Sequence, residues 1–351
     1  MIVNLTSNLT SNSSLCFNHT FEDYQLELLP VFYAFIFIFG IIGNSLVIMV
    51  LCVQGDLKAV ARIYIFNLAL ADLLCIIMLP FWATYYAYGL SWIFGSVMCK
   101  ISSSLINLNL FASIFFITCM SIDRYMAIVY PLQSERRTLN QAVIVALSVW
   151  VLAIVFTLPT FHFRNTYYIK DLDVHACVMD FPQQAYSKWC ITMSLIKVVF
   201  GFCFPVTVII TCYLMIGLHL KKSQGSVLNK QSRDRVLKIV TAIVVCFIIC
   251  WLPFHVVTFL DVLTRLKVIQ DCRTVMLVEA ALPISLCLGF SNSCLNPLLY
   301  CFVGNQFREN FRHVIGSIKL LHNTNSQENS SRKGSDSREP EPCRANARSS
   351  V

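Results

Sequence analysis

The sequence predicts an all-α membrane protein, a bundle of seven transmembrane helices, and three observations support this. Of the 351 residues, 56% are hydrophobic and only 13% are charged, whereas a soluble domain carries about 25% charged residues. Seven apolar runs are long enough to cross a bilayer as helices. Lys and Arg gather on one side of these runs, as expected of cytoplasmic segments. The expected spans are 29–53, 63–88, 99–122, 142–161, 190–216, 239–263 and 275–303.

The positive charges predict the orientation of the chain. Residues 1–30 contain no Lys or Arg, whereas the connection after the fifth span contains Lys221, Lys222 and Lys230. The positive-inside rule therefore places the N-terminus outside the cell and the C-terminus in the cytoplasm. Most of the net charge of +8 belongs to this inner collar. It indicates a membrane surface as the partner and gives no sign of nucleic-acid binding.

We expect four parts along the chain. Residues 1–28 form an outer tail, and residues 29–303 form the helical bundle. Residues 304–318 form an amphipathic helix on the inner leaflet, because aromatic and basic residues alternate there at helical spacing. Residues 319–351 are rich in Ser, Arg and Glu and form a disordered cytoplasmic tail. The outer tail contains four glycosylation sequons, at Asn4, Asn8, Asn12 and Asn18.

Most of the 16 cysteines lie within the expected spans, where they are small core residues more often than ligands. Four of them, Cys16, Cys99, Cys177 and Cys272, fall on the outer side, where disulfides persist. Four cysteines allow three pairings. A zinc site is the competing interpretation, but the chain has no Cys-x-x-Cys motif to support it.

The third span organises the rest of the chain. Its apolar stretch from Cys99 to Tyr130 would be about 48 Å long as a helix, which exceeds the roughly 30 Å hydrocarbon core. The helix must therefore tilt or lie at the centre of the bundle. Its inner end carries Asp123-Arg124-Tyr125.

Asp72, in the second span, is a carboxylate at membrane depth. Such a group costs on the order of 2.5–3.5 kcal/mol, so it should face the interior and have polar partners. It is either a hydrogen-bonded structural residue or part of a site for a small cation, for which sodium is the candidate. The candidate partners are Asn44, Asn109, Ser113, Asn292 and Asn296.

Two groups near the outer ends of the spans have competing interpretations. Trp82 and Tyr85 belong either to an interfacial aromatic belt or to the mouth of a pocket. Lys197 lies about two turns before Pro205, and it either faces a wet cavity or an anion, or extends to the interface. Between these spans, the segment around Cys177 reads as a strand, half of a possible hairpin.

The sixth and seventh spans each contain a proline motif, Cys250-Trp251-Leu252-Pro253 and Asn296-Pro297-Leu298-Leu299-Tyr300. Proline removes a backbone hydrogen bond and kinks a helix. An indole beside such a kink can pack in two alternative positions and so act as a switch. Here the indole is that of Trp251, and Phe247 lies one turn away.

These motifs resemble those of the rhodopsin-like G-protein-coupled receptors, over about residues 30–316. Each span carries one of them, in the order of that family: Asn44, Asp72, Asp123-Arg124-Tyr125, Trp150, Pro205, Cys250 to Pro253, and Asn296 to Tyr300.

Finer detail resembles the angiotensin II receptors, and the type 2 branch of that family more than the type 1 branch. The resemblance lies in stretches such as Trp82 to Tyr86, Phe111 to Met120, Thr258 to Asp261 and Cys301 to Asn305. It implies angiotensin II as the ligand, a G protein or other cytoplasmic effector as the partner, the plasma membrane as the location, and no catalytic activity.

The resemblance also implies roles for residues on the outer side. Cys99 would pair with Cys177, and Cys16 with Cys272. Arg164 and Lys197 would hold the carboxylate of the peptide deep in the cavity. Two acids, Asp261 and Glu279, would meet the arginine of the peptide near the mouth. The cavity would be lined by Tyr33, Trp82, Tyr85 and Leu110.

For activation, the resemblance implies that Asn109 holds the resting state through Asp72. Peptide binding would change the packing of Trp251 and Phe247 beside Pro253, and Arg124 would then be released from Asp123. Tyr125, Asn292 and Tyr300 belong to the same activation set.

Other receptor classes fit less well. A light receptor needs a lysine in the seventh span, where Phe290 stands, and an amine receptor needs an aspartate near Ile106. A transporter or intramembrane protease would need internal repeats or paired catalytic groups, which we do not find. A type 1 angiotensin receptor or another peptide or chemokine receptor is the alternative.

Overall fold

The computed structural model describes residues 22–53, 59–135, 138–170, 173–222 and 230–303. Several predictions fall outside these residues. They are the four sequons at Asn4, Asn8, Asn12 and Asn18, the disulfide partner Cys16, the amphipathic helix 304–318 and the tail 319–351.

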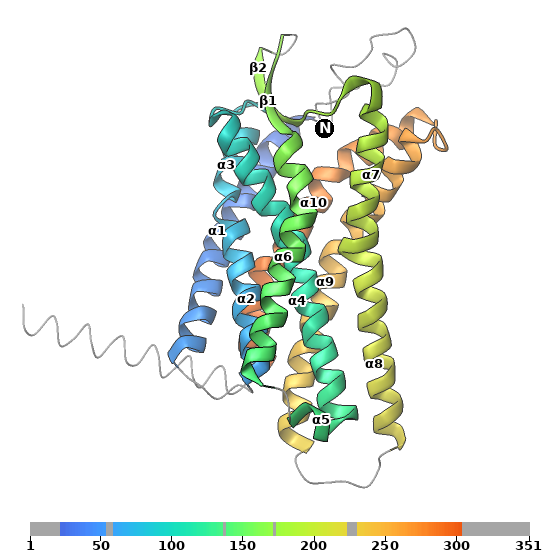
Figure 1. The fold of residues 1–351 in the computed structure, drawn as a ribbon. Coiled ribbons are helices and arrows are strands. Elements are labelled where there is room, and N and C mark those ends of the chain that lie inside the picture. The colour runs from blue at the N-terminus through green and yellow to red at the C-terminus, as the bar shows by residue number, and fades with distance from the viewer. Residues whose placement is uncertain (1–21, 54–58, 136–137, 171–172, 223–229, 304–351) are drawn as a thin grey trace, which may run out of the picture.

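The described part of the chain contains seven helical segments that are long and apolar enough to span a membrane, which confirms the predicted seven-helix bundle (Figure 1). The chain is therefore a multi-pass membrane protein. Some spans consist of more than one element. In chain order the helices are α1 (Glu22–Val53), α2 (Ala59–Ile76), α3 (Leu79–Ala87), α4 (Gly95–Val129), α5 (Pro131–Glu135), α6 (Leu139–Phe163), η4 (Gln183–Ala185), α7 (Tyr186–Val198), η5 (Val199–Cys203), α8 (Phe204–Lys222), α9 (Lys230–Arg265) and α10 (Cys272–Val303).

Proline explains the break in the second span. Helix α2 ends at Ile76, and the Met78 amide then donates to the Cys75 carbonyl at 3.0 Å. Pro80 lies in the first turn of α3, where its missing N–H leaves no intrahelical bond unmade. The break lets α3, which carries Trp82 and Tyr85, run in its own direction.

The fifth span contains a π-helical turn that the sequence analysis did not predict. This turn, η5, separates α7 from α8 and ends just before Pro205. Because proline cannot donate a backbone hydrogen bond, the ladder has to be interrupted near this position. A wider turn at such a point is frequent at functional sites, and here it directly follows Lys197 and Val198.

Helix α4 is the central helix, which is one of the two arrangements that its length allowed. It has 35 residues, and more than half of its most apolar stretch is buried, the largest fraction among the seven spans. It packs on α2, α6, α8 and α9, and near its outer end on β1.

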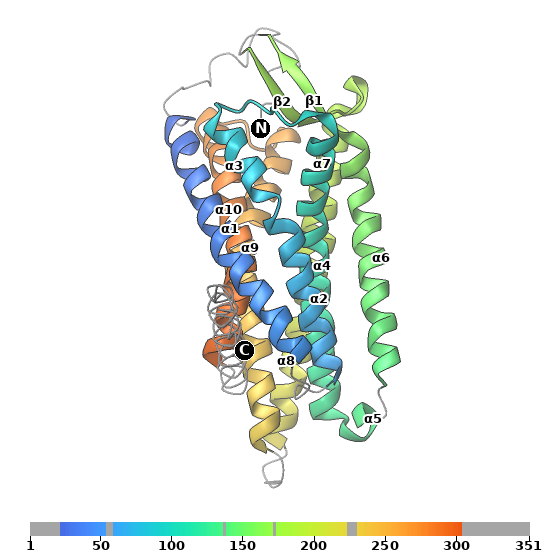
Figure 2. The same ribbon diagram turned by 90° about the vertical axis from the view of Figure 1, so that its left-hand side faces the viewer.

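A β-hairpin covers the end of the bundle that the positive charges predict to lie outside the cell, the outer end. Strands β1 (Arg164–Ile169) and β2 (Val174–Met179) pair antiparallel, with Arg164 opposite Met179. Figures 1 and 2 place this hairpin at the end of the bundle where α3 and α7 lie. A disulfide between Cys99 and Cys177 ties β2 to α4, which confirms this predicted pair. Cys272 is also disulfide-bonded, and its predicted pairing with Cys16 stays a prediction.

The bundle is apolar outside and partly polar inside. Side chains such as Val151 and Leu214 are 62% exposed on the outer faces, as suits contact with lipid. In contrast, Asp72, Asn44 and Asn296 are fully buried. A buried polar group needs hydrogen-bond partners, so the interior polar residues mark the places where the helices are held in a defined arrangement.

Candidate functional site

A cavity of about 350 Å³ lies in the outer half of the bundle, beneath the β-hairpin. Its walls come from α1, α3, α4, α6, α7, α9 and α10, with the start of β1 and part of β2. Seven of the eight predicted ligand-binding residues line it, namely Tyr33, Trp82, Tyr85, Leu110, Arg164, Lys197 and Asp261. The interpretation of Trp82 and Tyr85 as part of a pocket is therefore the one the structure supports.

Glu279 is the predicted ligand-binding residue that does not belong to this cavity lining. It is half-buried on α10, while Leu282, Pro283 and Leu286 of the same helix do line the cavity. Because α10 enters the bundle from its outer end, Glu279 lies about one to two turns farther out than these residues.

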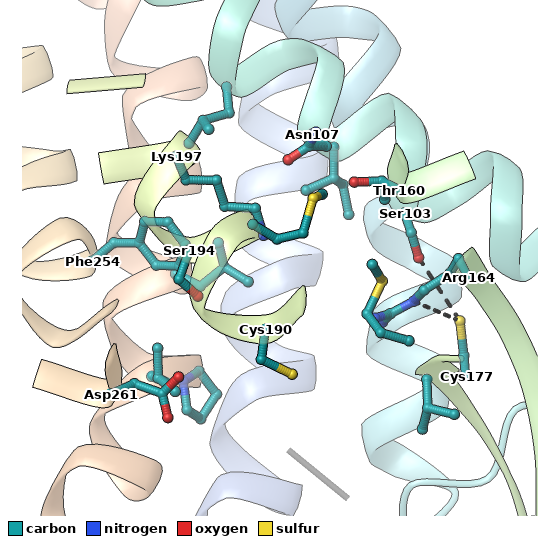
Figure 3. A pocket seen from close by; sticks show the side chains of 18 of the residues that line it. Ser103, Asn107, Thr160, Arg164, Cys177, Cys190, Ser194, Lys197, Phe254 and Asp261 are labelled. Carbon is teal, nitrogen blue, oxygen red and sulfur yellow. Dashed lines mark hydrogen bonds between the residues drawn. The ribbon is translucent and has the colours of Figure 1, made fainter. Parts of the chain in front are cut away.

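Two cations extend into the cavity from different walls (Figure 3). Arg164, at the start of β1, donates from Nε to Cys177 Sγ at 3.4 Å, and its guanidinium carbon lies 5.4 Å from the centre of the Trp82 ring. Burial lowers the pKa of Arg164, and the nearby Tyr85 and Tyr86 act in the opposite direction. An arginine titrates so far above neutral pH that the group stays charged.

Lys197 lies on the opposite wall, in the last turn of α7. Arg164 is among the charges that act on its ammonium group. Among the described residues, neither cation forms a salt bridge. Two like charges in one cavity that no salt bridge among the described residues neutralises attract an anion, and a carboxylate can accept hydrogen bonds from both.

The other charged pair of the cavity is Asp261 and Arg265, both on α9. Arg265 Nε lies 2.8 Å from Asp261 Oδ2, and both residues line the cavity. Asp261 was a predicted ligand-binding residue and Arg265 was not, although a spacing of four residues on a helix brings two side chains together.

The floor of the cavity is aromatic. Trp251, Phe254 and Phe290 line it, and the Trp251 ring lies 5.7 Å from Phe254 and 6.5 Å from Phe290, edge to face with both. Phe247 lies one turn below, 6.2 Å from Trp251. Trp251 is 1% exposed, so a ligand that reaches the floor presses directly on the core of the bundle.

Below this floor, Asp72 is the centre of a buried polar network. Its carboxylate accepts hydrogen bonds from Asn109 at 3.0 Å, Ser293 at 2.7 Å and Asn296 at 2.9 Å. Asn109 also donates to the Ser113 hydroxyl at 3.1 Å. The network therefore connects α2, α4 and α10.

Two of the predicted partners of Asp72 form their hydrogen bonds elsewhere, and Ser293 is a partner that was not among the candidates. Asn292 donates to Cys246 Sγ at 3.8 Å, and Asn44 donates to the carbonyls of Gly40 and Ser293. Ser293 takes the place predicted for Asn292. Adjacent residues on a helix point about 100° apart, and the sequence alone gave no signal for which of the two faces Asp72.

The residues around Asp72 fit a small hard cation. Besides the carboxylate, Ser113 and Ser293 supply hydroxyl oxygens to the same region. The side-chain oxygens of Asn44 and Asn296 are buried and have no hydrogen-bond donor among the described residues. Carboxylate, hydroxyl and amide oxygens are the ligands that hard cations prefer.

The inner end of α4 carries an ion pair between neighbouring residues. Arg124 binds Asp123, and both side chains are almost fully buried. Tyr125 lies beside them, with its ring 5.9 Å from Tyr130, and Tyr300 is buried near the inner end of α10.

Comparison with known proteins agrees with this arrangement. Residues 43–300 match the model of the seven-transmembrane receptors of the rhodopsin family. The chain belongs to this family. It is 49% identical to the mouse type-2 angiotensin II receptor over 311 residues, which cover 89% of this chain and 86% of the relative. The human type-2 receptor is 47% identical, over 89% of this chain and 86% of its own length.

The type-1 receptors are more distant. The pig type-1 angiotensin II receptor is 41% identical, over 85% of this chain and 83% of its own length. The receptor described here is therefore a member of the angiotensin II receptor family on the type-2 side, as the motifs predicted. In the described cavity lining, Phe290 occupies the position where a light receptor needs a lysine, and Ile106 lies where an amine receptor needs an aspartate.

Proposed function

We propose that this receptor binds angiotensin II at the outer face of the plasma membrane and transmits the signal to a G protein or another cytoplasmic effector. The observation that carries the proposal is the pair of cations, Arg164 and Lys197, which have no salt-bridge partner among the described residues and face one cavity. A peptide carboxylate supplies the missing negative charge, because charge-assisted hydrogen bonds to such a group are strong. No catalytic step is part of this function.

Aromatic packing transmits the binding event in this proposal. The end of the peptide that carries the carboxylate lies close to Leu110, Trp251 and Phe290 at the floor. A ligand shifts a conformational equilibrium only through its different affinities for the two states. The peptide therefore has to bind better when Trp251 takes a second packing position against Phe247.

The inner half responds to this change of packing. Trp251 lies two residues before Pro253 within α9, and a new position of its ring moves the inner end of that helix. Arg124 is then released from Asp123, and the opened inner cavity accepts a helix of the effector. The positive charge of the inner connections predicts that the N-terminus lies outside the cell and the C-terminus in the cytoplasm.

A sodium ion at Asp72 is part of the proposal for the resting state. The ion would be held by the Asp72 carboxylate with Ser113, Ser293 and the side-chain oxygens of Asn44 and Asn296, and it would hold α2, α4 and α10 together. Replacing sodium with a large organic cation is expected to raise peptide affinity. In Asp72→Asn this dependence should disappear, and a wild-type dependence in that variant would rule the site out.

The proposal as a whole is tested with labelled angiotensin II on membranes that express the full chain. We expect saturable binding that unlabelled peptide displaces, and a response in a panel of second messengers. Membranes from cells that lack the chain are the control. If binding stays unsaturable at micromolar peptide, angiotensin II is not the ligand.

A further inference from the structure

One salt bridge occupies the acidic side of the ligand cavity. Asp261 is the one carboxylate among the described residues that line it, and Arg265 Nε donates to its Oδ2 at 2.8 Å. The two residues are one turn apart on α9, so the helix itself brings them together. The side chains are only 24% exposed for Arg265 and 13% exposed for Asp261. Water and salt therefore screen this pair less than a surface pair.

The charges on the cavity wall do not balance. The described lining residues include three cations, Arg164, Lys197 and Arg265, against Asp261. Tyr186 and Cys190 of α7 line the cavity together with Arg265, and neither side chain is a carboxylate. The Asp261–Arg265 pair is neutral as a unit. The cavity therefore attracts an anionic group of a ligand. A positively charged group of a ligand finds no unpaired carboxylate on the α9 wall.

We infer that Arg265 is a specificity-determining residue, which holds Asp261 and so reduces what a ligand arginine contributes to affinity. This inference rests on the proposed function, because it concerns the same cavity and the same peptide. A ligand arginine reaches Asp261 only by displacing Arg265, so one ion pair is lost for the one that forms. The displaced guanidinium then lies beside the incoming one, and such like-charge contact disfavours a ligand.

The ligand class follows from this charge pattern. It is a peptide with a carboxylate for Arg164 and Lys197 and with a neutral or acidic group at the level of Arg265. Angiotensin II keeps its carboxylate contacts in this cavity, while its arginine gains little.

The test compares angiotensin II with an analogue in which citrulline, the neutral isostere, replaces the arginine. In the unaltered receptor we expect the two peptides to differ in affinity by less than about threefold. In Arg265→Gln, Asp261 is free to bind the ligand arginine, and the analogue should bind at least about tenfold more weakly than angiotensin II, as for the loss of a hydrogen bond between charged groups. Arg265→Lys keeps a positive charge without the planar fork of the guanidinium. The ratio of the affinities of the two peptides should therefore lie between that of the unaltered receptor and that of Arg265→Gln.

Two controls accompany the test. Lys267→Gln removes a positive charge from an exposed position just beyond α9 and leaves the salt bridge in place, so it should keep the ratio of the unaltered receptor. Adding Asp261→Asn to Arg265→Gln should abolish the new preference for arginine. A tenfold ratio in the unaltered receptor, or no change of ratio in either Arg265 variant, overturns the inference alone. Absence of saturable binding in the unaltered receptor and in every variant overturns the proposed function, and the inference with it.

Discussion

At the scale of single residues, the proposed function depends on Lys197 and Arg164. The sequence left two interpretations of Lys197 open, a side chain that reaches the interface or one that faces a cavity. Its position at the end of α7, opposite Arg164, supports the second (Figure 3). The residue matters because its charge is not matched by a salt bridge within the described residues.

Replacing Lys197 with alanine should weaken angiotensin II binding at least about tenfold, because one charge-assisted hydrogen bond to the peptide carboxylate is lost. Displacement of labelled peptide measures this loss. Lys188→Ala is the matched control, since Lys188 is an exposed lysine of the same helix that does not line the cavity. Equal affinity of both variants would contradict the placement of the carboxylate between Arg164 and Lys197.

At the scale of helices, the Asp72 network and the Trp251 packing hold neighbouring elements in register. Asp72 receives donors from α4 and α10, so it couples three helices through one carboxylate. Trp251 connects α9 to α10 in a different way, by close packing. A Cβ added to Gly289 would lie 2.8 Å from Trp251 Cζ3, so glycine is what allows the indole to lie this close to α10.

The substitution Asn109→Gly should raise signalling in the absence of ligand. It removes the hydrogen bond from α4 to Asp72 and the one to Ser113, so the resting arrangement loses stability relative to the active one. A second-messenger assay without peptide measures the effect. Glycine also weakens a helix by about 1 kcal/mol, and Ser104→Gly on the same helix controls for this. A silent Asn109→Gly would show that this contact does not hold the resting state.

The substitution Gly289→Ala should destabilise the receptor by about 1–3 kcal/mol, as overpacking of a tight core does. The added methyl would force the Trp251 ring or α10 to move, and thermal unfolding of the purified receptor reports the cost. Gly217→Ala on α8 is the matched control, because a Cβ there meets no atom within 4 Å. Alanine at that site should be neutral or slightly stabilising. Equal melting temperatures for the two variants would refute the tight contact.

At the scale of the whole molecule, the bundle, the hairpin and the disulfide act together to form the site. The disulfide links Cys99 of α4 to Cys177 of β2, 78 residues apart. Arg164 starts β1 and also contacts Cys177 through its guanidinium. The position of this cation therefore depends on an element outside the membrane that is held by a covalent bond to the central helix.

Removing the disulfide with Cys99→Ser and Cys177→Ser should abolish saturable peptide binding, even where the protein still reaches the cell surface. The hairpin would no longer fix Arg164 opposite Lys197, and a disulfide that closes a loop of this length contributes on the order of 4 kcal/mol in the chain-entropy model. Binding assays with surface labelling measure both properties. Cys52→Ser, which removes an exposed free cysteine, should behave like the unaltered receptor. Retained affinity in the double variant would mean that the strand pairing alone positions Arg164.

The sequence by itself determined the number of spans, the family and most of the cavity residues. Span length and hydrophobicity are properties of each segment alone, and a bilayer selects them one segment at a time. The motif residues Asp72, Arg124 and Trp251 could be recognised for the same reason, since a polar or bulky group at membrane depth stands out without any neighbour.

Only the tertiary structure decided which side chains meet. It placed Ser293, not Asn292, against Asp72, paired Asp261 with Arg265, and left Glu279 outside the cavity lining. These outcomes depend on how each helix is rotated about its axis. A π-helical turn such as η5 changes that rotation for every residue that follows, and packing against the neighbouring helices sets it, which no single segment of the sequence encodes.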